Sequence, residues 1–266
     1  MRYNYTMKFI NLFILFVCVH AAAYSQDFSL FTKQLFIQKS DTLPYRIMVP
    51  DHYDSEKKYP LVIFLHGSGE RGNDNEKQLV HGAELFLRDS IRKKYPAVIV
   101  FPQCSVNSYW SNVNILTDAK TGSRIFNYQM DSKPTIAMSL LLNLVNDLQR
   151  KYSIQKKKIY ISGLSMGGMG TFEIVRRKPN LFAAAMPICG AANPATASKL
   201  TKTNWWIFHG EKDDVVNPQY SKEMAMAILN EGGSAKLTIY PNANHNSWDS
   251  AFAESNFIQW MFSNHK

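Results

Sequence analysis

Short uninterrupted runs of apolar residues recur along the chain and stop at a small or polar residue. Leu61–Leu65 ends at His66. Ala97–Phe101 ends at a proline, and Ile159–Ser162 ends at a glycine. Such runs are typical of strands that are buried on both faces of a parallel sheet. The same pattern predicts further strands over Leu35–Gln38, Tyr45–Val49, Ala183–Ile188, Trp205–Phe208 and Leu237–Tyr240.

Helical patterns lie between these runs. Apolar residues at helical spacing predict helices over Thr135–Tyr152, Met166–Arg177, Tyr220–Asn230 and Ser250–Phe262. Alternating strands and helices predict an α/β fold, with a mostly parallel central sheet of about eight strands flanked by helices. Residues 103–134 lack clear periodicity, which predicts a long loop. Loops of this length are often lids or substrate-binding insertions, and a plain surface excursion is the alternative.

The first 25 residues have the layout of an export signal. Arg2 and Lys8 precede the apolar stretch Phe9–Ala23, and small residues favour a cut after Ser25. This stretch is shorter than the roughly 20 residues of a membrane helix. We therefore expect a secreted or periplasmic protein with no stable membrane insertion after signal removal. An uncleaved anchor and lipoprotein cleavage at Cys18 are the alternatives.

Residues 26–266 have the size of one α/β domain. The chain carries a net charge of +9, but its basic clusters at 92–94 and 156–158 lie at a helix end and before a strand. Neither is interleaved with aromatic residues, so we expect no nucleic-acid partner. Two of the three cysteines, Cys104 and Cys189, remain after signal removal, and their pairing stays open.

Ser165 stands in a G-x-S-x-G segment that follows a predicted strand and precedes a predicted helix. This context is what a nucleophile elbow requires. Because the elbow strains the backbone, the residues two before and two after the serine must be tiny, and Gly163 and Gly167 meet that demand. The segment predicts Ser165 as a nucleophile. An ordinary glycine-rich turn with a buried serine is the alternative.

A nucleophilic serine needs a histidine base and an acid that orients the base. In this elbow arrangement the acid and then the histidine follow the serine along the chain. The histidines after Ser165 are His209, His245 and His265. His265 lies at the fraying chain end, and only Glu173 is an acid between Ser165 and His209. His245, in a polar loop, is therefore the predicted base.

Two aspartates follow the strand Trp205–Phe208 and are candidates for the acid. They are Asp213 and Asp214, and spacing alone leaves both open. Whichever aspartate is not the acid of the triad is expected to serve as a turn residue or as a capping group of the next helix.

Backbone N–H groups must stabilise the oxyanion that forms during attack. One is expected from Met166, directly after the nucleophile. The second is expected from the loop after Leu61–Leu65, where Ser68 is favoured over Gly67. His66 is predicted to hydrogen-bond this loop rather than to act as a second base.

Six stretches of the chain resemble the α/β-hydrolase superfamily. More closely, they resemble a bacterial group of predicted peptidases, related to polyhydroxybutyrate depolymerases and to feruloyl and acetylxylan esterases. The stretches run in order through nearly all of residues 26–266. They are residues 61–75, 101–104 with Trp110 downstream, 159–171, 182–190, 206–216 and 244–252.

The resemblance implies an α/β-hydrolase fold and selects Asp213, three residues after a His-Gly pair, as the acid of the triad. Two departures are visible. Alanines stand at positions 191 and 192 where relatives have glycines, and Asn217 precedes the proline where relatives place proline first. Neither departure touches the triad.

The predicted activity is that of a secreted serine hydrolase, specifically a carboxylic ester hydrolase that removes acetyl or feruloyl groups from glycans or small esters. A serine peptidase for short peptides is the alternative, and a catalytically inactive binding protein is less favoured. No cofactor is expected, and no metal-binding motif is present. Trp110 and Trp248 are candidate substrate contacts, with core packing as their alternative.

Overall fold

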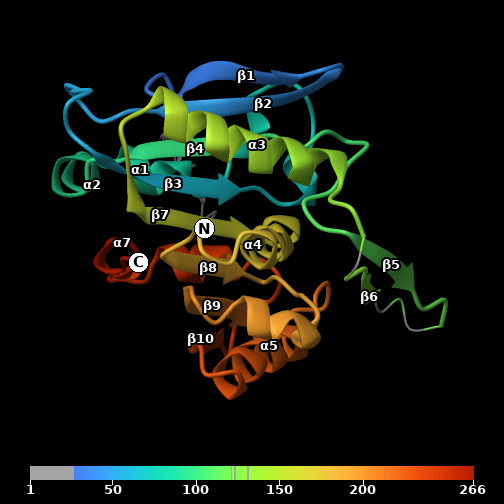
Figure 1. Cartoon of the computed structure of the whole chain (residues 1–266). Coiled ribbons are helices and arrows are strands. Elements are labelled where there is room, and N and C mark those ends of the chain that lie inside the picture. The colour runs from blue at the N-terminus through green and yellow to red at the C-terminus, as the bar shows by residue number, and fades with distance from the viewer. Residues whose placement is uncertain (1–26, 121, 123, 131) are drawn as a thin grey trace, which may run out of the picture.

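The computed structural model describes residues 27–120, 122, 124–130 and 132–266 (Figure 1). The predicted export signal lies outside these residues, so export stays a prediction. Within the described part of the chain, none of the helices has the length and apolar character needed to cross a membrane.

Ten strands and seven α-helices are formed by the described residues. The strands are β1 (Thr32–Gln38), β2 (Asp41–Met48), β3 (Tyr59–Leu65), β4 (Val98–Pro102), β5 (Val113–Thr117), β6 (Arg124–Tyr128), β7 (Ile154–Leu164), β8 (Ala184–Ile188), β9 (Asn204–Gly210) and β10 (Ser234–Tyr240). The helices are α1 (Ala83–Leu87), α2 (Asp89–Lys94), α3 (Ile136–Lys151), α4 (Met166–Arg177), α5 (Gln219–Asn230), α6 (Trp248–Phe252) and α7 (Phe257–Ser263). Short 3₁₀ helices are η1 (Ser68–Glu70), η2 (Lys77–Leu79) and η3 (Pro194–Lys199).

The main sheet has eight strands in the order β1-β2-β4-β3-β7-β8-β9-β10. The β1–β2 and β2–β4 pairs are antiparallel, and the other pairs are parallel, which confirms the predicted mostly parallel α/β sheet. After β3 the chain forms β4 on one side of it, and after β7 it forms β8, β9 and β10 in turn toward the opposite edge of the sheet. Strands β3 and β7 are neighbours, so the sheet has its topological switch point between them, where ligands bind in such folds.

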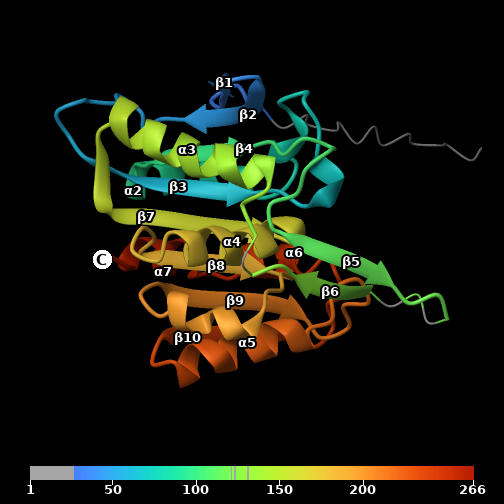
Figure 2. The same cartoon turned by 45° about the vertical axis from the view of Figure 1, so that its right-hand side comes forward.

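Both faces of the sheet are buried, because successive side chains of a strand point to opposite sides. In β3, Leu61 and Ile63 pack under the face that α3, α4 and α5 cover, whereas Val62 and Phe64 pack under the other helices. Figures 1 and 2 show α3, α4 and α5 on one face of the sheet and α1, α2, α6 and α7 on the other. Double-sided burial explains why the strands are continuous apolar runs in the sequence.

The expected long loop at residues 103–134 carries a hairpin of its own, formed by β5 and β6. Phe126 is buried on one side of this hairpin, while Leu116 and Ile125 are exposed. In Figure 2 the hairpin projects from the end of the sheet at which the arrowheads of β3, β7 and β9 lie. The prediction of an irregular segment was therefore wrong in part.

The single helix predicted over Ser250–Phe262 is instead two helices, α6 and α7. The chain turns between them at residues 253–256. There Glu254 accepts a hydrogen bond of 2.9 Å from the Tyr240 hydroxyl at the end of β10. This contact accompanies the break, and the apolar residues on either side still face one core.

Candidate active site

Ser165 stands at the sharp turn between β7 and α4. Its φ of 53° and ψ of −116° put it in the sparsely populated left-handed half of conformational space. A Cβ atom on Gly167 would lie 2.0 Å from the carbonyl oxygen of Leu65, so only glycine fits there. This local geometry confirms the predicted elbow. It lifts the serine hydroxyl above the carboxyl end of the sheet.

His245 connects the serine to an acid. Its Nε2 lies 3.0 Å from Ser165 Oγ, and its Nδ1 lies 2.8 Å from Asp213 Oδ2. The carboxylate only accepts, so Nδ1 carries the hydrogen and Nε2 is free to accept the serine proton. The three residues come from loops after β7, β9 and β10. Their arrangement is that of a Ser-His-Asp triad.

The acid is Asp213, which is buried, whereas Asp214 is exposed. Asp213 Oδ1 accepts the N–H groups of Val215 and Val216 at 2.9 and 2.8 Å. Burial alone would raise the pKa of the Asp213 carboxyl. The hydrogen bonds from two histidines and from the Val216 N–H outweigh it and hold that pKa well below its usual value. Asp213 therefore stays ionised next to His245.

His209 is a functional neighbour that sequence reasoning missed. It is fully buried at the end of β9, and its Nε2 lies 3.1 Å from Asp213 Oδ2 and 2.9 Å from the Val216 carbonyl oxygen. Neither oxygen can donate, so Nε2 must carry the hydrogen. On the other side of the ring, Nδ1 lies 2.7 Å from Ser221 Oγ. His209 is not a base, but it holds the acid of the triad.

The predicted oxyanion loop lies beside the serine, because β3 and β7 are paired. A Cβ atom built on Gly67 would lie 3.7 Å from Ser165 Cβ. Ser68 begins the short helix η1 and is exposed. The roles of the Ser68 and Met166 N–H groups stay predictions, since they concern a reaction intermediate.

His66 stabilises this loop, as the sequence predicts. Its Nε2 accepts the Cys104 N–H at 2.9 Å, so Nδ1 carries the hydrogen and donates to the Gly67 carbonyl at 2.6 Å. Burial lowers the pKa of His66 to about 4, which keeps the ring neutral. A neutral His66 fixes the chain just before the predicted oxyanion donor Ser68.

The two tryptophans predicted as substrate contacts differ in exposure. Trp110 is 0% exposed and packs against His66, with ring centroids 5.5 Å apart, and against Gly170. A fully buried ring presents no surface to a substrate, so that prediction was wrong for Trp110. Trp248 is only half-buried, and its ring lies edge-on to that of His245 at 5.7 Å. Trp248 therefore remains a candidate contact.

A small apolar cluster joins the β5–β6 hairpin to the triad. Phe126 of the hairpin is buried with Met169 and Val216. The Met169 N–H donates to the Ser165 carbonyl oxygen at 3.0 Å, and Val216 is the residue that donates to Asp213. The hairpin thus rests on residues that hold the nucleophile and the acid.

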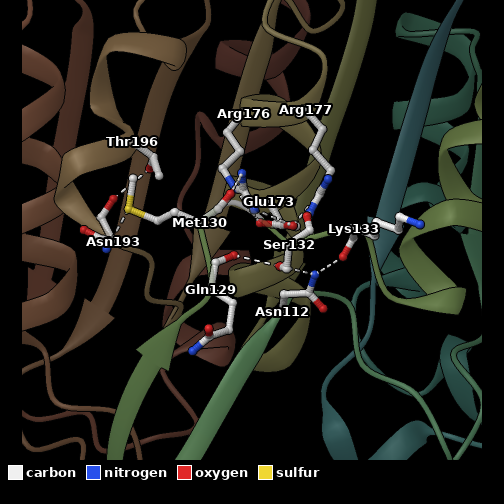
Figure 3. Close-up of polar contacts among 10 residues, drawn as sticks. All are labelled: Asn112, Gln129, Met130, Ser132, Lys133, Glu173, Arg176, Arg177, Asn193 and Thr196. Carbon is white, nitrogen blue, oxygen red and sulfur yellow. Dashed lines mark hydrogen bonds and ion pairs between the residues drawn. The ribbon is translucent and has the colours of Figure 1, made fainter.

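A buried carboxylate of α4 secures the returning limb of the hairpin (Figure 3). Glu173 accepts hydrogen bonds from the Nε atoms of Arg176 and Arg177 at 2.7 and 2.6 Å. The same two guanidinium groups donate to the carbonyl oxygens of Met130 and Ser132 at 3.0 and 2.9 Å. Glu173 therefore acts as an anchor for the hairpin, not as a catalytic acid.

One group of potential metal ligands occurs among the described residues, and it overlaps the triad. Ligand atoms of Cys189, Asp213 and His245 lie within 4.8 Å of one another. Burial and the nearby Asp213 charge raise the pKa of the Cys189 thiol well above its usual value, whereas metal ligation requires a thiolate. Cys104 and Cys189 are both free and buried, so the open question of a disulfide is answered.

A match to a known family agrees with this geometry. Residues 52–261 match the family model described as Phospholipase/Carboxylesterase. The chain belongs to this family. The phospholipase/carboxylesterase match spans both the elbow at Ser165 and the loops of Asp213 and His245.

Two curated proteins are similar to parts of this phospholipase/carboxylesterase chain. A bifunctional acetylxylan esterase/xylanase of Neocallimastix patriciarum is 36% identical over 77 residues, which are 29% of this chain and 11% of that protein. Lysophospholipase-like protein 1 of Mus musculus is 26% identical over 196 residues, which are 69% of this chain and 79% of that protein.

Solved structures of esterases are similar to this chain. A thermostable esterase is similar with a TM-score of 0.78 and 31% identity, over 90% of this chain and 64% of that one. A ferulic acid esterase of Anaeromyces mucronatus has a TM-score of 0.62 at 18% identity, over 87% and 90% of the two chains. The second likeness shows the fold alone. This chain thus spans less than two thirds of the thermostable esterase.

Proposed function

We propose that the protein is a carboxylic ester hydrolase that removes acyl groups, of the acetyl or feruloyl type, from glycans or small esters. The observation that carries this proposal is the continuous hydrogen-bonded path from Ser165 Oγ through His245 to Asp213, at 3.0 and 2.8 Å. The path ends at a serine that the elbow exposes beside the Gly67 loop.

In the acylation step Ser165 Oγ attacks the ester carbonyl carbon, and His245 Nε2 takes the hydroxyl proton. Asp213 holds the imidazole and stabilises the imidazolium that forms. The N–H groups of Met166 and Ser68 stabilise the oxyanion of the tetrahedral intermediate. The C–O bond to the alcohol then breaks, and His245 passes its proton to the departing alcohol oxygen. The acyl group remains on Ser165.

In the deacylation step water replaces the alcohol. His245 takes a proton from this water, which attacks the acyl carbon and forms a second tetrahedral intermediate. The bond to Ser165 Oγ breaks, the serine regains its proton from His245, and the carboxylic acid leaves. The residues named here supply every proton transfer in the cycle.

Two observations support the choice of substrate class. Proteins that carry the names acetylxylan esterase and ferulic acid esterase are among the similar ones. The half-buried ring of Trp248 lies beside the catalytic histidine, where it would stack on a sugar or an aromatic acyl group. The proposed export of the protein, with a cut after Ser25, suits a polymeric substrate outside the cell. N-terminal sequencing of the mature protein tests that cut.

The proposal is tested with the purified protein on 4-nitrophenyl acetate, methyl ferulate, acetylated xylan and an aminoacyl nitroanilide. We expect turnover of the esters and little of the anilide, because amides have poorer leaving groups. Ser165→Ala is expected to lose at least about 10³-fold in kcat on each ester while keeping its fold. Amide turnover without ester turnover contradicts the proposal, and full activity of Ser165→Ala shows that the nucleophile is wrong.

A further inference from the structure

A second carboxylate lies beside the catalytic serine, and the triad does not use it. Glu70 ends the short helix η1, which begins at the predicted oxyanion donor Ser68. A Cβ atom built on Gly67 would lie 3.0 Å from Glu70 Oε2 and 3.7 Å from Ser165 Cβ, so both residues flank Gly67. Glu70 therefore lies next to the nucleophile, on the loop that approaches the substrate.

The Glu70 carboxylate lacks a hydrogen-bond donor among the residues that the structure describes. Its Oε2 is buried and unpartnered, and its side chain as a whole is 16% exposed. The next residue, Arg71, donates instead to the carbonyl oxygens of Ser68 and Val106. Leaving a mostly buried carboxylate without a donor costs free energy. Such groups in native structures call for an explanation.

His81 and Trp248 connect this carboxylate to the catalytic base. His81 Nε2 lies 3.9 Å from Glu70 Oε1, too far for a hydrogen bond, so His81 faces the carboxylate without donating to it. The His81 ring lies 5.2 Å from the Trp248 ring, which in turn lies 5.7 Å from that of His245. His81 is 31% exposed in its side chain, so this side of the site is open to solvent.

The position of His245 indicates which portion of the ester binds on this side of the site. In acylation His245 must donate a proton to the departing alcohol oxygen, so residues that flank its ring lie beside the alcohol portion of the ester. An aromatic ring and a carboxylate together bind a sugar well. The ring covers the apolar face of the sugar, and the carboxylate accepts its hydroxyl groups in charge-assisted hydrogen bonds.

We propose that Glu70, His81 and Trp248 form a subsite for the alcohol portion of the ester, and that this portion is a sugar. Glu70 accepts a sugar hydroxyl group that neighbours the acylated one, and Trp248 stacks on the ring. The hydroxyl donates to Glu70 Oε1, which faces His81, because Oε2 is fully buried. This inference rests on the proposed esterase function and adds the identity of the leaving group.

The test compares two esters that share an acyl group and differ in the alcohol, acetylated xylobiose and 4-nitrophenyl acetate. Glu70→Ala is expected to lower kcat/KM for the sugar ester by about 10- to 100-fold more than for the aryl ester. Glu70→Gln keeps an accepting oxygen without the charge, so its selective loss is expected to be smaller. Trp248→Ala is expected to raise KM for the sugar ester more than KM for the aryl ester.

A binding measurement separates recognition from support of the loop. Titration calorimetry of Ser165→Ala with acetylated xylobiose gives the affinity, and adding Glu70→Gln to that variant is expected to weaken it. The matched control is Glu84→Gln on α1, an exposed glutamate outside the site. It is expected to change neither the kcat/KM ratio of the two esters nor the affinity for acetylated xylobiose.

Three outcomes overturn the inference. Equal losses on both esters show that Glu70 only supports the oxyanion loop. Absence of sugar-ester turnover by an otherwise active wild-type protein shows that the leaving group is not a sugar. A preference for esters whose alcohol carries an ammonium group shows that Glu70 binds a cation. Failure of the esterase proposal itself looks different, because the wild-type protein would then hydrolyse neither ester.

Discussion

His209 Nε2 donates to Asp213 Oδ2, the same oxygen that accepts the hydrogen bond of His245 Nδ1. The acid of the triad is thus held between two histidines, one buried and one facing the serine. Its other oxygen is held by two backbone N–H groups. A carboxylate with four donors has little freedom to rotate, so the orientation of His245 is set by residues that never touch the substrate.

Replacing His209 tests this arrangement. His209→Ala is expected to lower kcat by about 10-fold with little change in KM, and to destabilise the fold by about 1–3 kcal/mol. The reason is that Asp213 loses a buried donor. His209→Gln retains an N–H at similar reach and is expected to recover part of both losses. Steady-state kinetics and thermal unfolding provide the measurements. A change in KM alone would refute a positioning role.

The two aspartates that spacing left open are distinguished by kinetics. Asp213→Asn is expected to lower kcat by about 10³- to 10⁴-fold, because the amide favours the wrong tautomer of His245. Asp214→Asn changes an exposed side chain and is expected to stay within about twofold of the wild type. Comparable losses in both variants would mean that the acid is wrongly assigned.

Stability is expected to fall at acidic pH. The folded state holds the Asp213 pKa below its usual 3.8, so the ionised carboxylate stabilises the fold above about pH 4. That contribution is lost as pH falls through the lowered pKa. Urea unfolding at pH 5, 4 and 3 measures how the free energy of unfolding depends on pH. Asp213→Asn is expected to flatten the dependence of the unfolding free energy on pH, because it removes the buried carboxylate.

The elbow is expected to tolerate no side chain at Gly167. A methyl group there would lie 2.0 Å from the Leu65 carbonyl oxygen, so Gly167→Ala should destabilise the fold by about 3 kcal/mol or more. Gly69→Ala is the matched control, because a methyl group at Gly69 meets nothing within 4 Å. Chemical denaturation measures both. Equal stability of the two variants would show that the elbow relaxes.

Trp110 is expected to affect stability and not substrate binding. Trp110→Ala removes a fully buried ring and should cost about 3–5 kcal/mol of unfolding free energy. Trp110→Phe keeps most of the packing, and its KM for esters is expected to match the wild type. A raised KM in Trp110→Phe with unchanged unfolding would restore Trp110 as a substrate contact.

The sequence predicts the sheet and the nucleophile for two physical reasons, whereas the choice of Asp213 over Asp214 depends on the family resemblance. Strands such as β3 and β9 are buried on both faces and therefore appear as continuous apolar runs, and the elbow demands glycines at fixed positions around Ser165. The β5–β6 hairpin is buried only around Phe126, so its pattern is weak. The order of residues along the chain identifies His209 only as a possible base, and its support of Asp213 depends on tertiary contacts that no spacing reveals.

The attachment of the β5–β6 hairpin has a consequence for how this enzyme scaffold diversifies. Arg176 and Arg177 grip the main-chain carbonyls of Met130 and Ser132, and every amino acid possesses such a carbonyl. Exposed side chains of the hairpin, unlike the buried Phe126, can therefore change without loss of these hydrogen bonds to α4. Selection can thus alter the exposed surface of the hairpin while its main-chain attachment to α4 stays the same.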